Sequence, residues 1–160
     1  MNIRVGFGFD VHQLEAGEQI ILGGISIPSS KKAVGHSDAD VLIHAICDAI
    51  LGAAGLRDIG VHFPNTDMSI KGIDSKILLK KTFDMIHSKG YEIGNIDATV
   101  CLENPKINPH VEAMKITLAA VLDISVDDIS IKATTNEGLG YVGREDGVNA
   151  YAVALLHRRD

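Results

Sequence analysis

One stretch of the chain, between residues 40 and 54, constrains the fold more than any other. Its side chains are apolar on every side of a helix and include Val41, Leu42, Ile43, Ala45, Ile46, Cys47, Ala49, Ile50 and Leu51. A helix that is apolar all round is expected to be buried, so the stretch predicts the centre of the protein. Its only polar residues up to Leu51 are Asp40, His44 and Asp48, which recur at every fourth position and form one narrow stripe.

The polar stripe needs partners inside the protein, because an unpaired buried charge is costly. One interpretation is a structural hydrogen-bond network. The other is a metal site that shares ligands with a second segment.

That second segment is residues 3–12, which alternate with the period of a β-strand. One face of the strand is apolar, and the opposite face carries Gly6, Gly8, Asp10 and His12. Residues two apart on a strand point to the same side, so Asp10 and His12 can converge on one cation. The two glycines permit a close approach to the backbone. Two solvated polar residues at a strand end are the alternative.

Asp10, His12 and His44 together make a set of two imidazoles and one carboxylate. Three protein ligands and one open position are typical of a catalytic zinc site. Two imidazoles favour Zn²⁺ over Mg²⁺, although manganese or cobalt can substitute. We expect Asp40 or Asp48 to orient a ligand imidazole from behind.

Two further segments suit an anionic ligand. Residues 35–38 place His36 and Ser37 at a predicted helix start, where free N–H groups attract anions. Residues 132–138 combine hydroxyls, glycine and Glu137, which can cradle phosphate and hold a hard cation. A capping loop and a polar strand-to-loop junction are the alternatives.

The chain of 160 residues predicts a single domain, residues 1–160. We expect strands over residues 3–12, a short strand pair within 19–28, then 91–103, 129–135 and 148–157. We expect helices over residues 38–55, 74–89 and 108–122. The first helix has Ser37 or Asp38 as its N-cap and Gly55 as its stop. Residues 29–37, 56–73 and 136–147 are expected to be loops. The fold class is α+β, a single-domain α/β sandwich with a mixed sheet packed on helices.

Composition excludes several classes of protein. The net charge is −6 and no basic cluster occurs, so no nucleic-acid partner is expected. No run approaches the ~20 apolar residues that span a membrane, and no apolar signal core opens the chain. Cys47 and Cys101 lack metal or redox spacing and read as buried residues of a cytoplasmic protein. The sequence contains no Walker A motif, no dinucleotide fingerprint and no GxSxG.

Seven segments, in order along the chain, resemble the 2-C-methyl-D-erythritol 2,4-cyclodiphosphate synthase family. They are residues 8–12, 35–44, 58–60, 62–64, 105–107, 132–137 and 139–144. The block His36-Ser37-Asp38-Ala39-Asp40 with its following helix is highly specific for this family.

The resemblance implies a homotrimer with active sites between neighbouring subunits. The substrate it implies is 4-diphosphocytidyl-2-C-methyl-D-erythritol 2-phosphate, a cytidine diphosphate compound. Its 2-phosphate attacks its own β-phosphorus, CMP leaves, and a cyclic diphosphate forms. Arg144 and Asp146 would line a central trimer cavity, and Asp146 stands in place of the Glu that is usual there.

The resemblance also implies roles for individual residues. Asp10, His12 and His44 match zinc ligands, and Glu137 matches the carboxylate that holds Mg²⁺ or Mn²⁺ with the diphosphate. His36 and Thr135 match residues that stabilise the transition state. The residues that match or lie beside the substrate-binding segments are Ser37, Asp58, Ile59, Gly60, Phe63, Pro64, Asn65, Asp67, Leu102, Pro105, Lys106, Ile107, Asn108, Thr134, Tyr141 and Arg144. Asn65 and Tyr141 replace the Asp and Phe that are frequent in the family.

Two other functions compete with this one. A zinc-dependent phosphatase or phosphodiesterase would activate water at the same metal. A metal-stabilised binding trimer would use the ion for structure alone, without turnover.

Overall fold

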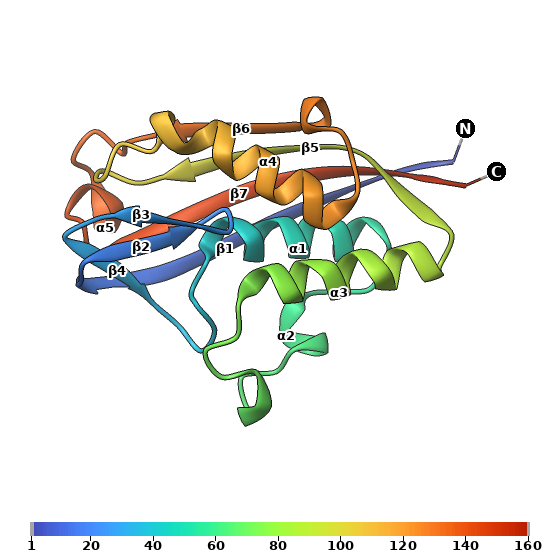
Figure 1. Cartoon of the computed structure of the whole chain (residues 1–160), viewed down its shortest axis with the longest axis horizontal. Helices are drawn as coiled ribbons and strands as arrows, with labels where there is room; N and C mark the ends of the chain where they lie inside the picture. Colours follow the sequence, from blue (N-terminus) through green and yellow to red (C-terminus); the bar gives the residue numbers. More distant parts are fainter. Residues whose placement is uncertain (1, 160) are drawn as a thin grey trace.

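The computed structural model describes residues 2–159, which form a five-stranded mixed sheet covered by helices on one face (Figure 1). The strand order is β4 (Lys31–Val34), β1 (Ile3–Ala16), β7 (Gly147–Arg158), β5 (Tyr91–Cys101) and β6 (Ile129–Thr134). Only β5 and β6 pair in parallel among these strands, and the other neighbours are antiparallel. A separate hairpin consists of β2 (Gln19–Leu22) and β3 (Ile25–Pro28). The predicted mixed sheet and α+β class are confirmed.

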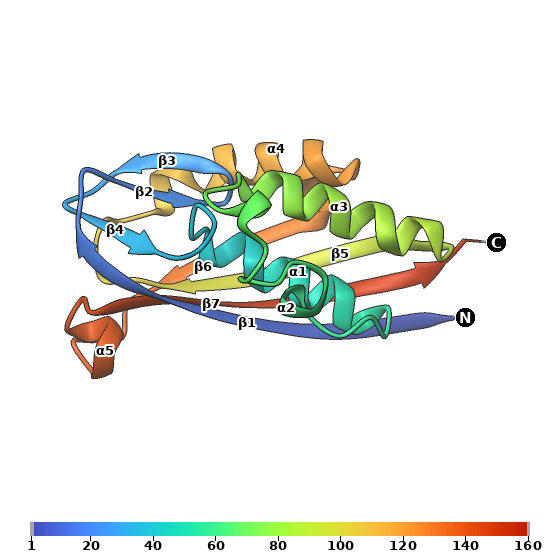
Figure 2. The same cartoon turned by 90° about the horizontal axis from the view of Figure 1, so that it is seen from below.

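Three longer helices cover the sheet on the same side: α1 (Val41–Ala53), α3 (Ser75–Ser88) and α4 (Val111–Leu122) (Figure 2). α1 lies against β1 and β7, and α3 packs against α1. The apolar side chains of α1 from Val41 to Leu51 are completely buried, as the all-round apolar pattern predicts. Gly55 follows the end of α1 with a φ of +71°, which confirms it as the stop.

The glycines of β1 allow α1 to pack directly against the sheet. A Cβ atom on Gly8 would overlap the carbonyl oxygen of Ala45, and one on Gly6 would overlap that of Ala49. The backbone of the helix therefore rests directly on the backbone of the strand. This contact accounts for the close approach that the glycine pair predicts.

The structure adds elements where the sequence predicts loops. Residues 29–37 contain β4, residues 56–73 contain the short helix α2 (Ile59–His62) and a 3₁₀ turn, and residues 136–147 contain α5 (Gly140–Gly143). Each is only three or four residues long, too short to show a period in the sequence.

Two predicted boundaries are also corrected. The N-cap of α1 is Asp40, whose side chain accepts from the N–H of Ile43, and neither Ser37 nor Asp38 takes this position. The predicted helix over 108–122 begins with a 3₁₀ turn, Asn108–His110, before α4. Among the described residues, no helix combines the length and apolarity needed to cross a membrane.

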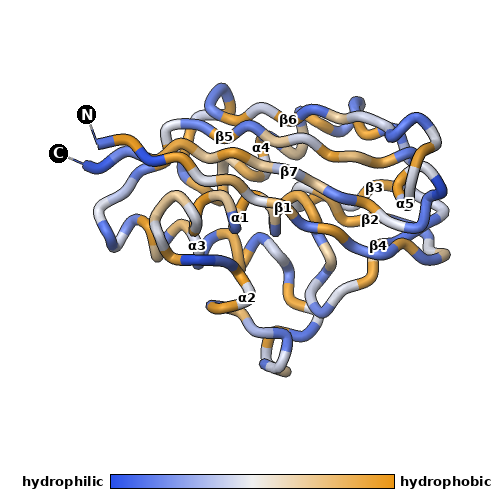
Figure 3. The backbone as a smooth tube through the Cα atoms, turned by 180° about the vertical axis from the view of Figure 1, so that it is seen from behind, coloured by the Kyte–Doolittle hydropathy of each residue, from blue (hydrophilic) through white to orange (hydrophobic). Residues whose placement is uncertain are grey.

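The opposite face of the sheet carries apolar side chains without a covering helix. The exposed set on β1 and β7 comprises Ile3, Val5, Phe7, Phe9, Val11, Tyr151 and Val153. Phe7 is 63% exposed although it lies in the middle of a strand. Figure 3 shows this side of the molecule, with hydrophobic stretches along β1 and β7. A contiguous apolar face of this kind marks an interaction surface.

The helix–glycine contact gives a test of the fold. We expect Gly8→Ala to destabilise the protein by roughly 3 kcal/mol or more, because the added methyl group meets backbone that cannot move aside. Urea unfolding followed by circular dichroism measures the change. Gly52→Ala is the matched control, because its new Cβ would lie 3.9 Å from the nearest atom, the carbonyl oxygen of Phe7. That variant should be more stable by up to about 1 kcal/mol. Equal effects at both positions would contradict the contact.

Candidate active site

Asp10, His12 and His44 converge in the structure as the sequence predicts. The Oδ2 atom of Asp10 lies 2.8 Å from Nε2 of His12 and 3.0 Å from Nδ1 of His44. The two imidazole nitrogens are 3.1 Å apart. β1 supplies the first two residues and α1 supplies the third, so the contact between this strand and helix assembles the cluster.

The cluster fits a divalent metal ion. In a tetrahedral zinc site with bonds of about 2.0–2.1 Å, the ligand atoms lie about 3.3 Å apart. The three donor atoms already form a triangle of nearly this size. Two neutral imidazoles and a carboxylate leave one coordination position for a substrate oxygen, which is the arrangement of catalytic rather than structural zinc.

Each imidazole is held from behind by a hydrogen bond to its second nitrogen. Nδ1 of His12 lies 2.9 Å from the carbonyl oxygen of Val34, an acceptor on β4. The Nδ1–H therefore donates to this carbonyl, and Nε2 keeps its lone pair toward the cluster. On His44 the second nitrogen is Nε2, which lies 3.0 Å from Oγ of Ser75 and 3.1 Å from Oγ of Ser37.

The cluster also shifts proton affinities. Burial alone would raise the pKa of Asp10, but hydrogen bonds and charge from His12 and His44 lower it to about 2. Burial acts to lower the pKa of His12. The hydrogen bond to Asp10, the charge of Asp10 and the hydrogen bond to the Val34 carbonyl outweigh burial, so the pKa is raised. The site therefore favours a carboxylate next to positive charge.

The sequence predicts that Asp40 or Asp48 orients a ligand imidazole, but in the structure both side chains bind backbone amides instead. Asp40 is fully buried and accepts from the N–H groups of Gly23, Gly24 and Ile43, so it joins the β2–β3 hairpin to the start of α1. Asp48 accepts from the N–H of Ile59 at 2.8 Å and so holds α2. Within residues 2–159, neither carboxylate hydrogen-bonds to a ligand imidazole, and both accept from backbone amides instead.

A cavity of about 390 Å³ opens beside the metal cluster. Of the predicted site residues, it is lined by Asp10, His12, His36, Ser37, His44, Ile59, Gly60, Phe63 and Asn65. The ring of His36 is oriented by the carbonyl oxygen of Asp67, 3.1 Å from its Nε2. Asp58 caps α2 by accepting from the N–H of Val61, and so shapes the wall that Ile59 and Gly60 present.

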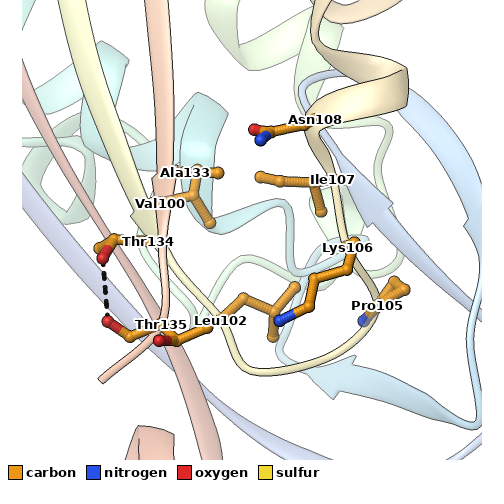
Figure 4. Close-up of a pocket in the computed structure, with 9 residues that line it drawn as sticks. All are labelled: Val100, Leu102, Pro105, Lys106, Ile107, Asn108, Ala133, Thr134 and Thr135. Carbon is orange, nitrogen blue, oxygen red and sulfur yellow. Dashed lines mark hydrogen bonds between the residues drawn. The ribbon is translucent and has the colours of Figure 1, made fainter. Parts of the chain in front are cut away.

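A second group of predicted residues lines a cavity of about 180 Å³ at the other edge of the sheet, between the ends of β5 and β6 and the start of α4 (Figure 4). Its lining combines apolar and polar side chains: Val100, Leu102, Pro105, Lys106, Ile107, Asn108, Ala133, Thr134 and Thr135. An apolar slot with a cationic end suits a nucleotide base and its phosphate. The hydroxyl of Thr134 donates to the carbonyl of Thr135.

Several predicted residues lie outside both cavities in the described part of the chain. Pro64, Asp58 and Asp67 belong to the wall segment around α2 without lining the first cavity. Glu137 is exposed beyond Thr135, whose Oγ1 accepts its N–H at 3.3 Å.

Tyr141 and Arg144 belong to the α5 region rather than to either cavity within residues 2–159. The Tyr141 hydroxyl accepts from Asn149, and Arg144 pairs with Asp146 at 2.9 Å. These contacts hold the loop between β6 and β7.

Sequence patterns do not predict two residues that support the metal-ligand cluster. Ser75 and Val34 contact the imidazoles, yet both are more than twenty positions away along the chain from the ring they hold. No local sequence pattern marks these two residues, because only the packing of distant segments brings them to the imidazoles.

The fold and the site together define an α+β enzyme domain with a candidate three-ligand site that is compatible with a divalent metal. The sequence model of the YgbB family matches residues 3–157. A relative from Cytophaga hutchinsonii named 2-C-methyl-D-erythritol 2,4-cyclodiphosphate synthase is 66% identical, covering 98% of each chain. A relative of the same name from Bacteroides thetaiotaomicron is 60% identical, covering 99% of each. The chain belongs to the YgbB family.

Solved structures agree with this assignment. One described as 2C-methyl-D-erythritol-2,4-cyclodiphosphate synthase in a CDP-bound form is 37% identical with a TM-score of 0.88, covering 96% of this chain and 99% of that one. The bifunctional IspDF of Campylobacter jejuni is 41% identical with a TM-score of 0.95. The alignment covers 99% of this chain and 43% of the bifunctional one, so the chain corresponds to a part of that protein.

The lowered pKa of Asp10 predicts an acid dependence of the metal-free protein. The pKa of this carboxyl falls from 3.8 in the unfolded chain to about 2 in the folded protein. It therefore stabilises the fold at pH values above the unfolded pKa, and this stabilisation is lost as the pH falls toward the folded pKa. We expect Asp10→Asn to cost about 2 kcal/mol near pH 5 and roughly half as much near pH 3. Urea unfolding with a chelator present measures both. A difference that does not change with pH would contradict the ion-paired carboxylate.

Proposed function

We propose that this chain converts 4-diphosphocytidyl-2-C-methyl-D-erythritol 2-phosphate into 2-C-methyl-D-erythritol 2,4-cyclodiphosphate and CMP. The observation that carries the proposal is the metal-ligand triangle of Asp10, His12 and His44 beside an open cavity, in a chain whose full-length relatives are named for this product. Isoprenoid precursor biosynthesis is the context of the reaction.

The reaction asks the protein for positioning and charge neutralisation, because the attacking group belongs to the substrate. When bound, a divalent metal held by Asp10, His12 and His44 would polarise a phosphate oxygen as a Lewis acid. His36 faces the same cavity and is proposed to stabilise charge that develops on the transferring phosphate. Holding both phosphates of one molecule in contact supplies the effective concentration for ring closure.

The second cavity is proposed to bind the cytidine end of the substrate. The solved relatives described as CDP-bound support a cytidine nucleotide. Lys106 offers the cavity a cation, and Thr134 and Thr135 offer hydroxyls. Glu137 is proposed to hold Mg²⁺ against the diphosphate, since an exposed carboxylate next to these hydroxyls is a hard oxygen ligand.

The complete site is proposed to form between neighbouring copies in a homotrimer. The two cavities of one chain share no lining residue and lie at opposite edges of the sheet. The uncovered apolar face of β1 and β7 supplies the contact surface, because burying it against other copies removes a large apolar area from water. A substrate with a metal-seeking diphosphate and a base would then bridge two subunits.

Turnover tests the reaction. We expect the protein with substrate, Mg²⁺ and Zn²⁺ to give CMP and a cyclic diphosphate in phosphorus NMR. In ¹⁸O-labelled water the product should carry no label, because no water is consumed. Labelled, ring-opened phosphate would instead support the phosphatase or phosphodiesterase alternative.

A ligand variant tests whether the metal is catalytic. We expect His44→Ala to lower kcat by more than roughly 100-fold, since even outer contacts of a metal site are worth 10–100-fold. Its circular dichroism spectrum and oligomeric state should persist, because an open site does not carry the fold. His87→Ala, near the end of α3 on the helix-covered side of the sheet, is the control and should remain active. Unfolding or dissociation of His44→Ala would favour the metal-stabilised binding trimer.

Assembly tests the shared site. We expect Phe7→Asp to convert the trimer to monomer and to abolish turnover, because it places a charge in the centre of the apolar face. Size-exclusion chromatography with light scattering measures the mass. Ile77→Asp, on the outer surface of α3 with 47% exposure, should leave the mass unchanged. A Phe7→Asp protein that keeps its assembly would contradict the proposed interface.

A further inference from the structure

We propose that Ser75 is a positioning residue of the metal centre, because its hydroxyl fixes which nitrogen of His44 faces the cation without a proton. The inference rests on the metal site of the proposed function and adds a residue to it. Ser75 is the first residue of α3 and is completely buried, and its Oγ lies 3.0 Å from Nε2 of His44. Nothing in its own segment of the sequence marks it as part of a site.

The direction of the hydrogen bond follows from the other partner of Ser75. Its hydroxyl donates to Oδ1 of Asp38, and its backbone N–H donates to Oδ2 of the same carboxylate at 2.9 Å. A hydroxyl has one proton, and here the carboxylate takes it. The oxygen of Ser75 can then only accept, so the contact with His44 requires a proton on Nε2.

The tautomer determines what His44 offers the cation. A neutral imidazole with its proton on Nε2 has a free lone pair on Nδ1. Nδ1 is the nitrogen that points to Oδ2 of Asp10 and to Nε2 of His12, at 3.0 and 3.1 Å. The chain from Asp38 through Ser75 to His44 therefore prepares the ring for a metal, as the Val34 carbonyl does for His12.

Ser37 cannot impose this choice by itself. Its Oγ also lies within hydrogen-bond distance of Nε2 of His44 and accepts the N–H of Ala39 at 3.3 Å. In the part of the chain that the structure describes, no other acceptor takes its hydroxyl proton, so this hydroxyl can donate to Nε2 as readily as accept from it. Only Ser75 is committed to one direction.

The wild-type protein gives the first test. Long-range ¹⁵N–¹H correlation spectra of the metal-free protein at alkaline pH report the tautomer of each histidine. The Asp10 carboxylate competes for a proton on the ring nitrogens that face it, at 2.8 and 3.0 Å. We expect Ser75 and the Val34 carbonyl to outweigh it, with His44 as the Nε2–H form and His12 as the Nδ1–H form. A predominant Nδ1–H form of His44 would overturn the proposal before any variant is made.

Ser75→Ala then tests the consequence for metal binding. We expect zinc affinity, measured by competition with a chromophoric chelator, to fall by about 10–100-fold, with a mixture of His44 tautomers in the metal-free spectrum. Thr82→Val is the matched control, since it removes another completely buried hydroxyl from α3 and should leave both readouts unchanged. An affinity within about twofold of wild type, with the tautomer retained, would reduce Ser75 to a structural role.

Asp38→Asn provides a second variant that keeps the side-chain shape. With its oxygen at the Ser75 N–H, the amide donates from its NH₂ group to the Ser75 hydroxyl oxygen and gives up the 3.2 Å contact of Oδ1 with the N–H of Asp40. The hydroxyl proton would then turn toward Nε2 of His44 and favour the wrong tautomer. We expect a shift toward Nδ1–H and a larger loss of zinc affinity than in Ser75→Ala. An unchanged tautomer here would contradict the relay.

These readouts are independent of the reaction. A wild-type protein that binds zinc with the expected tautomers but forms no cyclic product would refute the proposed function and leave this inference standing.

Discussion

The contact between α1 and the glycines of β1 is the constraint on which the rest of the structure depends. Two residues of strand advance about 6.7 Å and four residues of helix advance 6.0 Å, so the two backbones can stay in step. Gly8 meets Ala45 and Gly6 meets Ala49 in this register. The next step along β1 places Asp10 beside the first turns of α1, where His44 lies. A side chain at either glycine would lift the helix and separate the ligands.

The sequence predicts the centre of this arrangement well because its signals are local. The period of two puts Asp10 and His12 on one strand face, and the spacing of four isolates His44 on an otherwise apolar helix. The supporting contacts are not predictable in this way. Asp40 is recruited by hairpin amides, and Val34 belongs to a four-residue strand that pairs only at the sheet edge. Such partners depend on how distant segments pack.

The acidic composition is compatible with a polyphosphate ligand once the carboxylates are placed. The net charge of −6 by itself disfavours an anion. Asp10, however, faces two imidazoles and keeps a low pKa, so its carboxylate is placed to bind a cation and does not act as an isolated repelling charge. Each cavity of the chain holds only part of the groups that the proposed substrate needs, which is why we propose assembled copies as the unit of function.

The most direct measurement of this account is the position of a bound ion. Crystals grown with Zn²⁺ and measured on both sides of the zinc absorption edge give an anomalous difference map. We expect one strong peak per chain at about 2.0–2.2 Å from a carboxylate oxygen of Asp10, Nε2 of His12 and Nδ1 of His44. A peak bonded to Nε2 of His44, or zinc bound at another place with this triangle empty, would contradict it.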